Sequence, residues 1–500
     1  MGARRIDDVL ALAALGACAV LCLAFRYLPM VDLPQHYAMV SILVHHADPA
    51  WGFARRYTTD FLDRPYATVY WMGAALAHLM PLGAAMRIVV AVCTVAPLAG
   101  AHALLVATRR SRAWLLPAVP FAFGSLWHWG FLNFLLGTGM FLAGLALVVV
   151  AVERPGRRTP AALGVLGVVL LFTHFHGLAM LLMFAPVFAW AWARRDERLA
   201  PYVRALGPLV PAGVAAAAFV LLTWAHAQGR WARMNPGLVE RVQRFPEFLA
   251  AGSPDPWPGT WVIAFVAVAA AGVTLGGAWP RPTRALAALA IAFAAQVAMY
   301  FVLPLNTNTA TYVSARHALL VVLLALPLLP VVDGLRGHAV RALGAAIAVG
   351  ALAVTARQLA CFDHEARDFD GVLAAMLPDR RVAPLVFERS SACTHPRTFP
   401  YLHFGAYYQA AKGGELSRSF AVVWNVPIRY RADYHRYAIR EEVEWQPWLF
   451  SPQDARHFDY VLVRGPRTLP AQLGLREVAA SGAWTLFENP DALPAELPPP

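Results

Sequence analysis

Long apolar stretches recur through the first 360 residues of this chain, and they restrict it to a membrane-spanning fold. The hydrocarbon core of a bilayer is about 30 Å thick, which an α-helix crosses with about 20 apolar residues. Only 14% of the 500 residues are charged, too few for a soluble protein of this length. We therefore expect a polytopic α-helical membrane protein with about eleven spans. These are expected at 9–28, 87–108, 113–127, 132–152, 160–173, 177–193, 203–226, 260–278, 285–304, 317–332 and 339–360.

Arginine clusters between the apolar stretches predict the orientation of the chain. Residues 1–360 contain 27 arginines against 13 acidic residues, whereas residues 361–500 are close to balanced. Basic residues in short loops favour the cytoplasmic side, so this excess requires no nucleic-acid partner. All clusters lie inside if the N-terminus is cytoplasmic and segment 65–82 lies along the outer interface. If 65–82 crosses instead, the later clusters move outside. We expect the N-terminus inside, the C-terminus outside and a bacterial inner (plasma) membrane. The six clusters are Arg4–Arg5, Arg109–Arg112, Arg154–Arg158, Arg194–Arg204, Arg281–Arg284 and Arg336–Arg341.

The polar tail is expected to form a separate domain. We divide the chain into a transmembrane domain, 1–360, and a small extracytoplasmic (periplasmic) α/β domain, 361–500. Apolar runs at 382–387, 459–465 and 483–489 are bounded by Pro, Gly and Asn and predict strands, with a turn at Ser481-Gly482. Cys361 and Cys393 flank the start of this domain, and an oxidising compartment would allow them to pair.

The first outer loop, residues 29–86, carries the most concentrated set of ionisable groups. It begins with "VDLPQHYAMV", in which Asp32 precedes an apolar helical pattern and His36 follows one turn later. One interpretation is that Asp32 only caps this helix, with Gln35 completing a capping box. Further along the loop come Asp60, Asp63 and the pair Arg64-Pro65. Ionisable groups at the depth of a membrane interface are costly and are candidates for function.

Other polar side chains stand at the outer ends of the expected spans. "WHWGFLNF" contains His128 and Asn133, "FTHFHG" contains His174 and His176, and "SARHALL" contains Arg316 and His317. The histidines at 174 and 176 fit three roles: metal ligation, contact with phosphate or acceptor, or interfacial packing. The other three residues also have structural interpretations. Arg316 could extend to the lipid headgroups, and His128 could belong to the aromatic belt at the membrane interface. Asn133 could form a hydrogen bond between helices.

The order of these elements resembles the GT-C superfamily of polyprenyl-phosphate-dependent glycosyltransferases, closest to its aminoarabinose transferase and protein mannosyltransferase branches (family 39-like). The shared features are an N-terminal span, an acidic residue opening an outer interfacial helix, a basic-Pro pair, and an outward C-terminal domain. The resemblance implies that Asp32 is the essential acid and that Arg64-Pro65 matches the basic-Pro pair at the lipid-phosphate site. Leu33 follows Asp32 where many members have a second acid, and the later outer turn offers His128 and Asn133 instead of an acid.

The resemblance implies a membrane glycosyltransferase that moves a sugar from a polyprenyl-phosphate donor to an acceptor. Such a transfer needs a base for the acceptor proton, cations at the departing phosphate and a groove for the isoprenoid chain. Asp32 is the expected base, assisted by His36. The expected substrate-binding residues are Arg64, Asp60, Asp63, His128, Asn133, His174, His176, Arg316 and His317. A divalent metal, Mg or Mn, is a candidate cofactor, with Asp32, His174 and His176 as ligands.

Two other functions remain open at this level. A transporter or flippase of lipid-linked intermediates would show matching repeats with broken helices, and no repeat is visible. A catalytically silent assembly protein on the same scaffold is the second, because a fold does not fix a function. The sugar and the acceptor (a lipid, glycan or protein) cannot be read from the residues.

Overall fold

The computed structural model describes residues 3–60, 64–154, 156–194, 196–224, 235–250, 259–274, 283–307, 310–331, 334–423, 425–466, 469 and 471–494. Its residues divide into two compact units. The first unit comprises residues 1–21, 90–127 and 131–356, and the second comprises 22–89, 128–130 and 357–500. The predicted boundary at 360 lies close to the last of these divisions. However, most of the first outer loop groups with the C-terminal segment.

Long apolar helices confirm a polytopic membrane protein. Within the described ranges, seven helical segments are long and apolar enough to cross a bilayer. They belong to α1 (Ala3–Ala24), α4 (Leu82–Ala107), α6 (Leu132–Glu153), α8 (Phe175–Trp192), α9 with α10 (Ala200–Leu206 and Val210–Trp224), α13 (Arg284–Val302) and α15 (Gly334–Ala366). Each coincides with one of the eleven expected stretches, and the total of eleven stays a prediction.

The remaining expected spans form shorter helices. Three of them are α7 (Arg158–Thr173), α12 (Thr260–Thr274) and α14 (Arg316–Ala325). The stretch 113–127 is mostly a 3-10 helix, Arg112–Phe123, because Pro117 and Pro120 interrupt the α-helical hydrogen bonds. Segment 65–82 contains only α3 (Thr68–Ala77), whose ten residues rise about 15 Å, half the apolar thickness of a bilayer.

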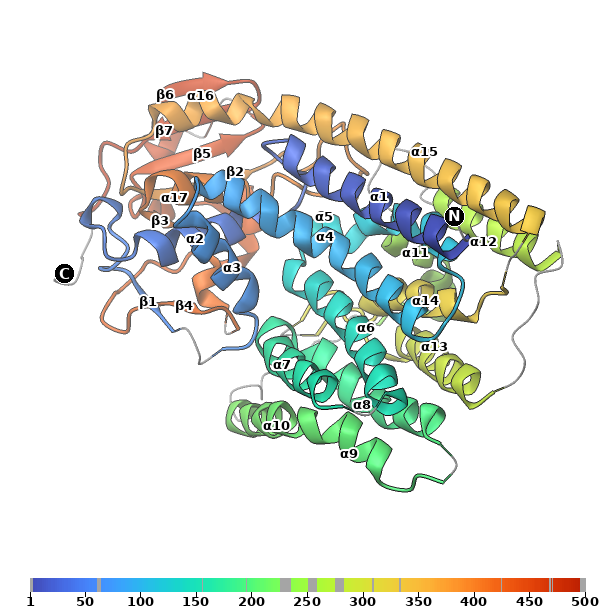
Figure 1. Cartoon of the computed structure of the whole chain (residues 1–500). Coiled ribbons are helices and arrows are strands. Elements are labelled where there is room, and N and C mark those ends of the chain that lie inside the picture. Colours follow the sequence, from blue (N-terminus) through green and yellow to red (C-terminus); the bar gives the residue numbers. More distant parts are fainter. Residues whose placement is uncertain are drawn as a thin grey trace. The chain divides into compact units, whose positions relative to one another are not determined.

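Helix packing in the first unit is reinforced by ion pairs at the start of α1. Asp7 lies 2.5 Å from Arg341 of α15, and both side chains are buried. Asp8 contacts Arg112 at 2.5 Å and His102 of α4 at 3.0 Å. These pairs explain why two acidic residues are tolerated in an otherwise apolar helix. Further along the chain, α6, α7 and α8 pack side by side (Figure 1).

The second unit is built around a five-stranded mixed sheet with the strand order β3-β2-β5-β7-β6. The central strand β5 (Tyr460–Arg464) pairs in parallel with β2 (Arg381–Val386) and antiparallel with β7 (Trp484–Glu488). The hairpin partner β6 (Arg476–Ser481) and the short β3 (Glu415–Leu416) form the edges. The three strands predicted at 382–387, 459–465 and 483–489 are therefore confirmed as β2, β5 and β7, and the turn at Ser481-Gly482 joins β6 to β7.

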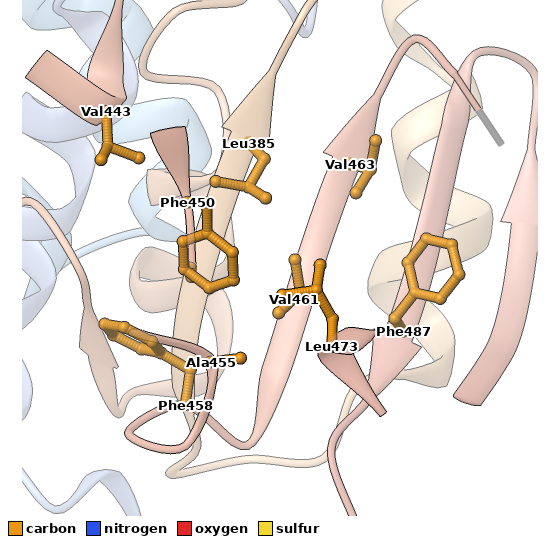
Figure 2. Close-up of a cluster of buried hydrophobic side chains, with 10 residues drawn as sticks. Leu385, Val443, Phe450, Ala455, Phe458, Val461, Val463, Leu473 and Phe487 are labelled. Atoms are coloured by element: carbon orange, nitrogen blue, oxygen red, sulfur yellow. The ribbon is translucent and has the colours of Figure 1, made fainter. Parts of the chain in front are cut away.

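Both faces of this sheet are covered. On one face, Leu385, Val461 and Val463 pack with other apolar side chains in a buried cluster (Figure 2). The rest of the cluster is Ala383, Val443, Phe450, Ala455, Phe458, Leu473 and Phe487. On the other face, Phe369 of α16 (Asp368–Ala375) contacts Trp484, with ring centroids 5.1 Å apart. Burial on both sides explains why the strand sequences are continuously apolar rather than alternating.

Three further elements of the second unit position the candidate site. α2 (Leu33–His45) packs against α17 (Ala406–Lys412), and Ser41 Oγ donates to the carbonyl of Ala410 at 3.0 Å. β1 (Tyr57–Thr59) pairs antiparallel with β4 (Ile428–Tyr430), so the first outer loop and the C-terminal segment share a second, two-stranded sheet. The Cys361–Cys393 disulfide is formed, with its Cα atoms 5.7 Å apart.

Candidate functional site

The side chain of Asp32 does not cap the helix that it precedes. Asp32 is the N-cap residue of α2, but its carboxylate accepts no hydrogen bond from the first turn. The capping-box interpretation is therefore wrong. Gln35 instead donates from Nε2 to the carbonyl of Arg418 at 3.2 Å and accepts from the amide of Phe420 at 3.1 Å. The carboxylate of Asp32 is left available for a different contact.

Asp32 is the first member of a row of four ionisable side chains in the second unit. Its Oδ1 lies 3.0 Å from Nδ1 of His403, and Nε2 of His403 lies 3.0 Å from Oε1 of Glu444. The same Glu444 oxygen lies 2.7 Å from Nε of Arg418. We call these four residues the carboxylate–histidine chain. The side chains of Asp32, His403 and Glu444 are only 16%, 11% and 12% exposed, so water screens them weakly.

Local backbone contacts place Asp32 opposite His403. The amide of Asp32 donates to the carbonyl of Trp129 at 3.1 Å, which ties the start of α2 to residues 128–130. Gly130 has a φ of 85°, and a Cβ there would come within 3.1 Å of Asp32. A glycine is therefore required at this position for the two segments to approach. His403 lies just before α17, and the packing of α17 on α2 brings its ring to Asp32.

The two carboxylates keep the imidazole of His403 charged. Burial lowers the pKa of His403, but the adjacent Asp32 and Glu444 outweigh it and raise the pKa to about 9. Burial raises the pKa of Glu444, yet the bond from His403 and the nearby Arg418 leave that pKa below its ordinary value. At neutral pH the chain therefore alternates in charge: carboxylate, imidazolium, carboxylate, guanidinium.

His36 is a structural partner of this region rather than a contact of Asp32's carboxylate. Its Nδ1 lies 3.0 Å from the hydroxyl of Tyr70, and its Nε2 lies 3.0 Å from the carbonyl of Gly130. The ring is buried, and burial lowers its pKa, so it is neutral at pH 7. His36 therefore joins α2 to α3 and to the 128–130 segment.

A small cavity borders the carboxylate–histidine chain. Its volume is about 80 Å³, room for a few water molecules. His403, Glu444 and Arg418 line it together with Arg436 and Arg440. The arginines outnumber the carboxylates in this lining, so the cavity favours anionic groups.

Of the other predicted residues of the first outer loop, Asp60 and Arg64 are among the described residues. Asp60 forms an ion pair with Arg429 at 3.0 Å, beside the β1–β4 ladder. Arg64 is half-buried in the segment that leads to α3. Asp63 lies outside the described residues.

A second polar cluster lies in the first unit. His174 has an extended backbone between α7 and α8, so His174 and His176 do not belong to one continuous helix. Arg316 donates from Nη1 to Nε2 of His174 at 3.1 Å and stacks on Phe131 and Phe134. The rings of His174 and His176 are 6.0 Å apart, and those of His176 and His317 are 4.8 Å apart. We call His174, His176, Arg316 and His317 the histidine–arginine cluster. His317 is itself fixed by Gln296, 2.7 Å from its Nδ1.

His128 and Asn133 are both buried. In the second unit, Gln358 donates from Nε2 to Nε2 of His128 at 3.1 Å. This bond agrees with a structural role better than with an exposed aromatic belt. Asn133 lies in the first turn of α6 in the first unit.

The predicted metal ligands do not fit a metal ion. Over the described ranges, no three His, Cys, Asp or Glu side chains are grouped so that they could hold one. Asp32 faces the cationic His403, and Nε2 of His174 accepts a hydrogen bond from Arg316. Both donor atoms already have cationic partners, so we derive no step through a metal.

Sequence reasoning missed His403, Glu444 and Arg418. All three lie in the C-terminal segment, far along the chain from Asp32, and no spacing rule links them to it. The only local signal is that "YLHFGAYYQ", residues 401–409, places one histidine among aromatic residues before a short helix.

The arrangement defines a class of fold: a polytopic α-helical membrane protein in which Asp32 opens α2 and the C-terminal segment contributes a mixed α/β sheet. Two crystal structures of ArnT from Cupriavidus metallidurans match over 99% of this chain and 100% of theirs, each with a TM-score of 0.50. One is the apo state, at 13% identity, and the other is bound to undecaprenyl phosphate, at 15% identity. A weaker match is the Archaeoglobus fulgidus oligosaccharyltransferase, with a TM-score of 0.37 and 12% identity over 90% of this chain and 68% of that one. No protein family and no curated protein matches the amino-acid sequence.

Proposed function

We propose that this protein is a GT-C-type membrane glycosyltransferase that moves a sugar from a polyprenyl-phosphate donor to an acceptor at the outer face of the inner membrane. The proposal rests on the contacts that the Asp32 carboxylate makes. Its carboxylate opens the outer helix, makes no capping bond and is held at the head of the carboxylate–histidine chain. The full-length fold similarity to ArnT, one of whose structures contains undecaprenyl phosphate, supports the choice of donor.

In this proposal Asp32 is the general base. An acceptor hydroxyl loses its proton to the carboxylate while its oxygen attacks the anomeric carbon of the donor sugar. The bond from that carbon to the phosphate oxygen breaks, and the polyprenyl phosphate leaves as an anion. A positioned base of this kind contributes on the order of 10²–10⁴-fold to a rate.

Cationic side chains are proposed to stabilise the departing phosphate. Arg64 has the planar guanidinium that binds phosphate through two parallel hydrogen bonds. Because cationic side chains can meet this need, the proposed transfer assigns no role to a divalent ion.

The test is the substitution Asp32→Asn in the purified full chain. Asn keeps the shape of the side chain but cannot accept the acceptor's proton. We expect at least about 100-fold slower release of undecaprenyl phosphate from a panel of undecaprenyl-phosphate-linked sugars, the lower end of the contribution of a general base. Thermal unfolding of the variant should show that it still folds.

Asp48→Asn is the matched control, because Asp48 is an acid of the same loop whose side chain caps a 3-10 turn by accepting from the amide of Ala50 at 3.0 Å. It should retain activity within about threefold, since asparagine caps a helix about as well as aspartate. An Asp32→Asn protein as active as the Asp48→Asn protein would remove Asp32 from the chemistry.

A further inference from the structure

We propose that His403 is a positioning residue, and that its imidazole, held between Asp32 and Glu444, aims the carboxylate of Asp32 for proton abstraction. The C-terminal segment would thereby complete a site that opens in the first outer loop. The catalytic part of this inference rests on the proposed function. The coupling between His403 and Asp32 does not.

The geometry places a carboxylate within ion-pair distance of each imidazole nitrogen, which favours the doubly protonated ring. Nδ1 lies 3.0 Å from Asp32 and Nε2 lies 3.0 Å from Glu444, and both partners are acceptor-only carboxylates. A neutral imidazole has one N–H and serves only one of them. The bridge between Asp32 and Glu444 therefore exists only while His403 is a cation.

Glu444 and Arg418 hold the far end of the bridge. Arg418 lies 2.7 Å from the Glu444 oxygen that His403 contacts, so Glu444 is fixed from two sides. The remaining neighbours of His403 are neutral or more distant. The ring of Phe420 lies 5.7 Å away edge-on, and His36 is an uncharged imidazole. Arg436, Arg440 and Glu441 line the adjoining cavity.

This arrangement predicts the direction of the pH dependence. The folded-state pKa of His403, about 9, lies above its ordinary value of about 6.5. The stabilisation from the bridge is therefore fully present below about pH 6.5 and is lost as the pH rises through about 9. Transfer should fall over the same alkaline range, because Asp32 then loses its fixed partner.

The first experiment needs no substrate. Histidine side-chain NMR of the ¹⁵N-labelled full chain, with His403 assigned by its loss in His403→Gln, gives the titration of this ring. We expect the His403 ring of the wild type to titrate with a midpoint near pH 9. In Asp32→Asn this midpoint should be lower by about 1 pH unit or more, because an adjacent opposite charge raises a histidine pKa by that amount. Glu444→Gln should act in the same direction. An unchanged midpoint in Asp32→Asn would overturn the proposal, whatever reaction the protein catalyses.

The second experiment separates positioning from structural support. His403→Gln should lower kcat about 100-fold, the loss that a 1 Å misplacement of a reacting group produces, with the KM for the donor within about twofold. It should also abolish the alkaline fall near pH 9. A His403→Gln enzyme with normal kcat and the same alkaline fall would exclude a positioning role.

His457→Gln is the matched control, because His457 is stacked on Tyr437 in the same unit and makes no contact with Asp32. It should change neither kcat nor the pH profile. If His403→Gln does not fold, the histidine signal with the alkaline midpoint near 9 is followed instead, and its shift or persistence in Asp32→Asn decides the matter. If Asp32→Asn retains full transfer but shifts that titration, the proposed function fails while the coupling stands.

Discussion

In the proposed reaction, Arg64 is the residue of the first outer loop that binds the donor phosphate. Arg64→Ala should raise the KM for the donor about tenfold or more, since a hydrogen bond to a charged group contributes about 1.5–3 kcal/mol. The measurement is donor kinetics in detergent or liposomes. Arg109→Ala is the control, because Arg109 is exposed and pairs with Glu153 at 2.9 Å. Equal effects from the two substitutions would show that Arg64 only helps to orient the chain in the membrane or contacts lipid headgroups.

A buried histidine with two fixed partners predicts a stability defect rather than a purely catalytic one. His36→Ala leaves the Tyr70 hydroxyl and the Gly130 carbonyl without their partner. We expect a loss of about 2 kcal/mol in the free energy of unfolding, because each buried unsatisfied group costs about 1–3 kcal/mol. Thermal unfolding measures it.

His45→Ala is a suitable comparison at the other end of α2, since the His45 ring only stacks on Trp51, with centroids 4.0 Å apart. Transfer by folded His36→Ala protein should fall less than in Asp32→Asn. A larger fall would mean that His36 acts on the reacting groups.

Some residues of the candidate site could be predicted from the sequence, and others could not. Asp32 was predicted as a site residue because an ionisable group at a membrane interface is costly. Its role as a cap was also a fair inference from local spacing, but tertiary contacts overrode it. The proximity of His403 and Glu444 to Asp32 could not be predicted from the sequence, because it depends on the packing of α17 on α2.

Among the elements, apolar composition was a reliable guide to helices and strands but not to helix type. The stretch 113–127 is as apolar as its neighbours, yet two prolines give it 3-10 geometry over most of its length. Strands β2, β5 and β7 were predicted because continuous apolar runs bounded by turn residues suit a sheet covered on both faces. The short β1, β3 and β4 carry two or three residues each and leave no periodic pattern.

The disulfide between α15 and the segment before α17 should stabilise the second unit. Its cysteines are 32 residues apart in sequence, a loop whose closure is worth about 3–4 kcal/mol in the chain-entropy account. The double substitution Cys361→Ser/Cys393→Ser should lower the unfolding temperature measurably. Reductant should lower it equally in the wild type and have no further effect on the double variant. A wild-type protein that reacts with thiol reagents at both positions before unfolding would show that the bond does not form.

At the scale of the whole molecule, reporter fusions test the predicted orientation in the membrane. We expect residues 361–500 to lie outside. A phosphatase reporter, active only after export, fused near residue 370 should therefore be active. A fusion near residue 156, in the predicted cytoplasmic Arg154–Arg158 cluster, should be inactive. The reverse pattern would invert the predicted topology and move the carboxylate–histidine chain to the cytoplasmic side.

The composition of the second unit has a consequence for how the protein is made. Gln35 bonds to Phe420, 385 residues further along the chain. At a synthesis rate of about 5–20 residues per second, α2 waits roughly 20–80 s for this partner. Throughout that interval the ribosome is still producing the intervening spans. The apolar surface of α2 that α17 will cover stays exposed. Folding of the second unit therefore waits until residues 406–420 have been made, and slowed translation of the intervening spans would lower the yield of folded protein before it altered any property of the finished molecule.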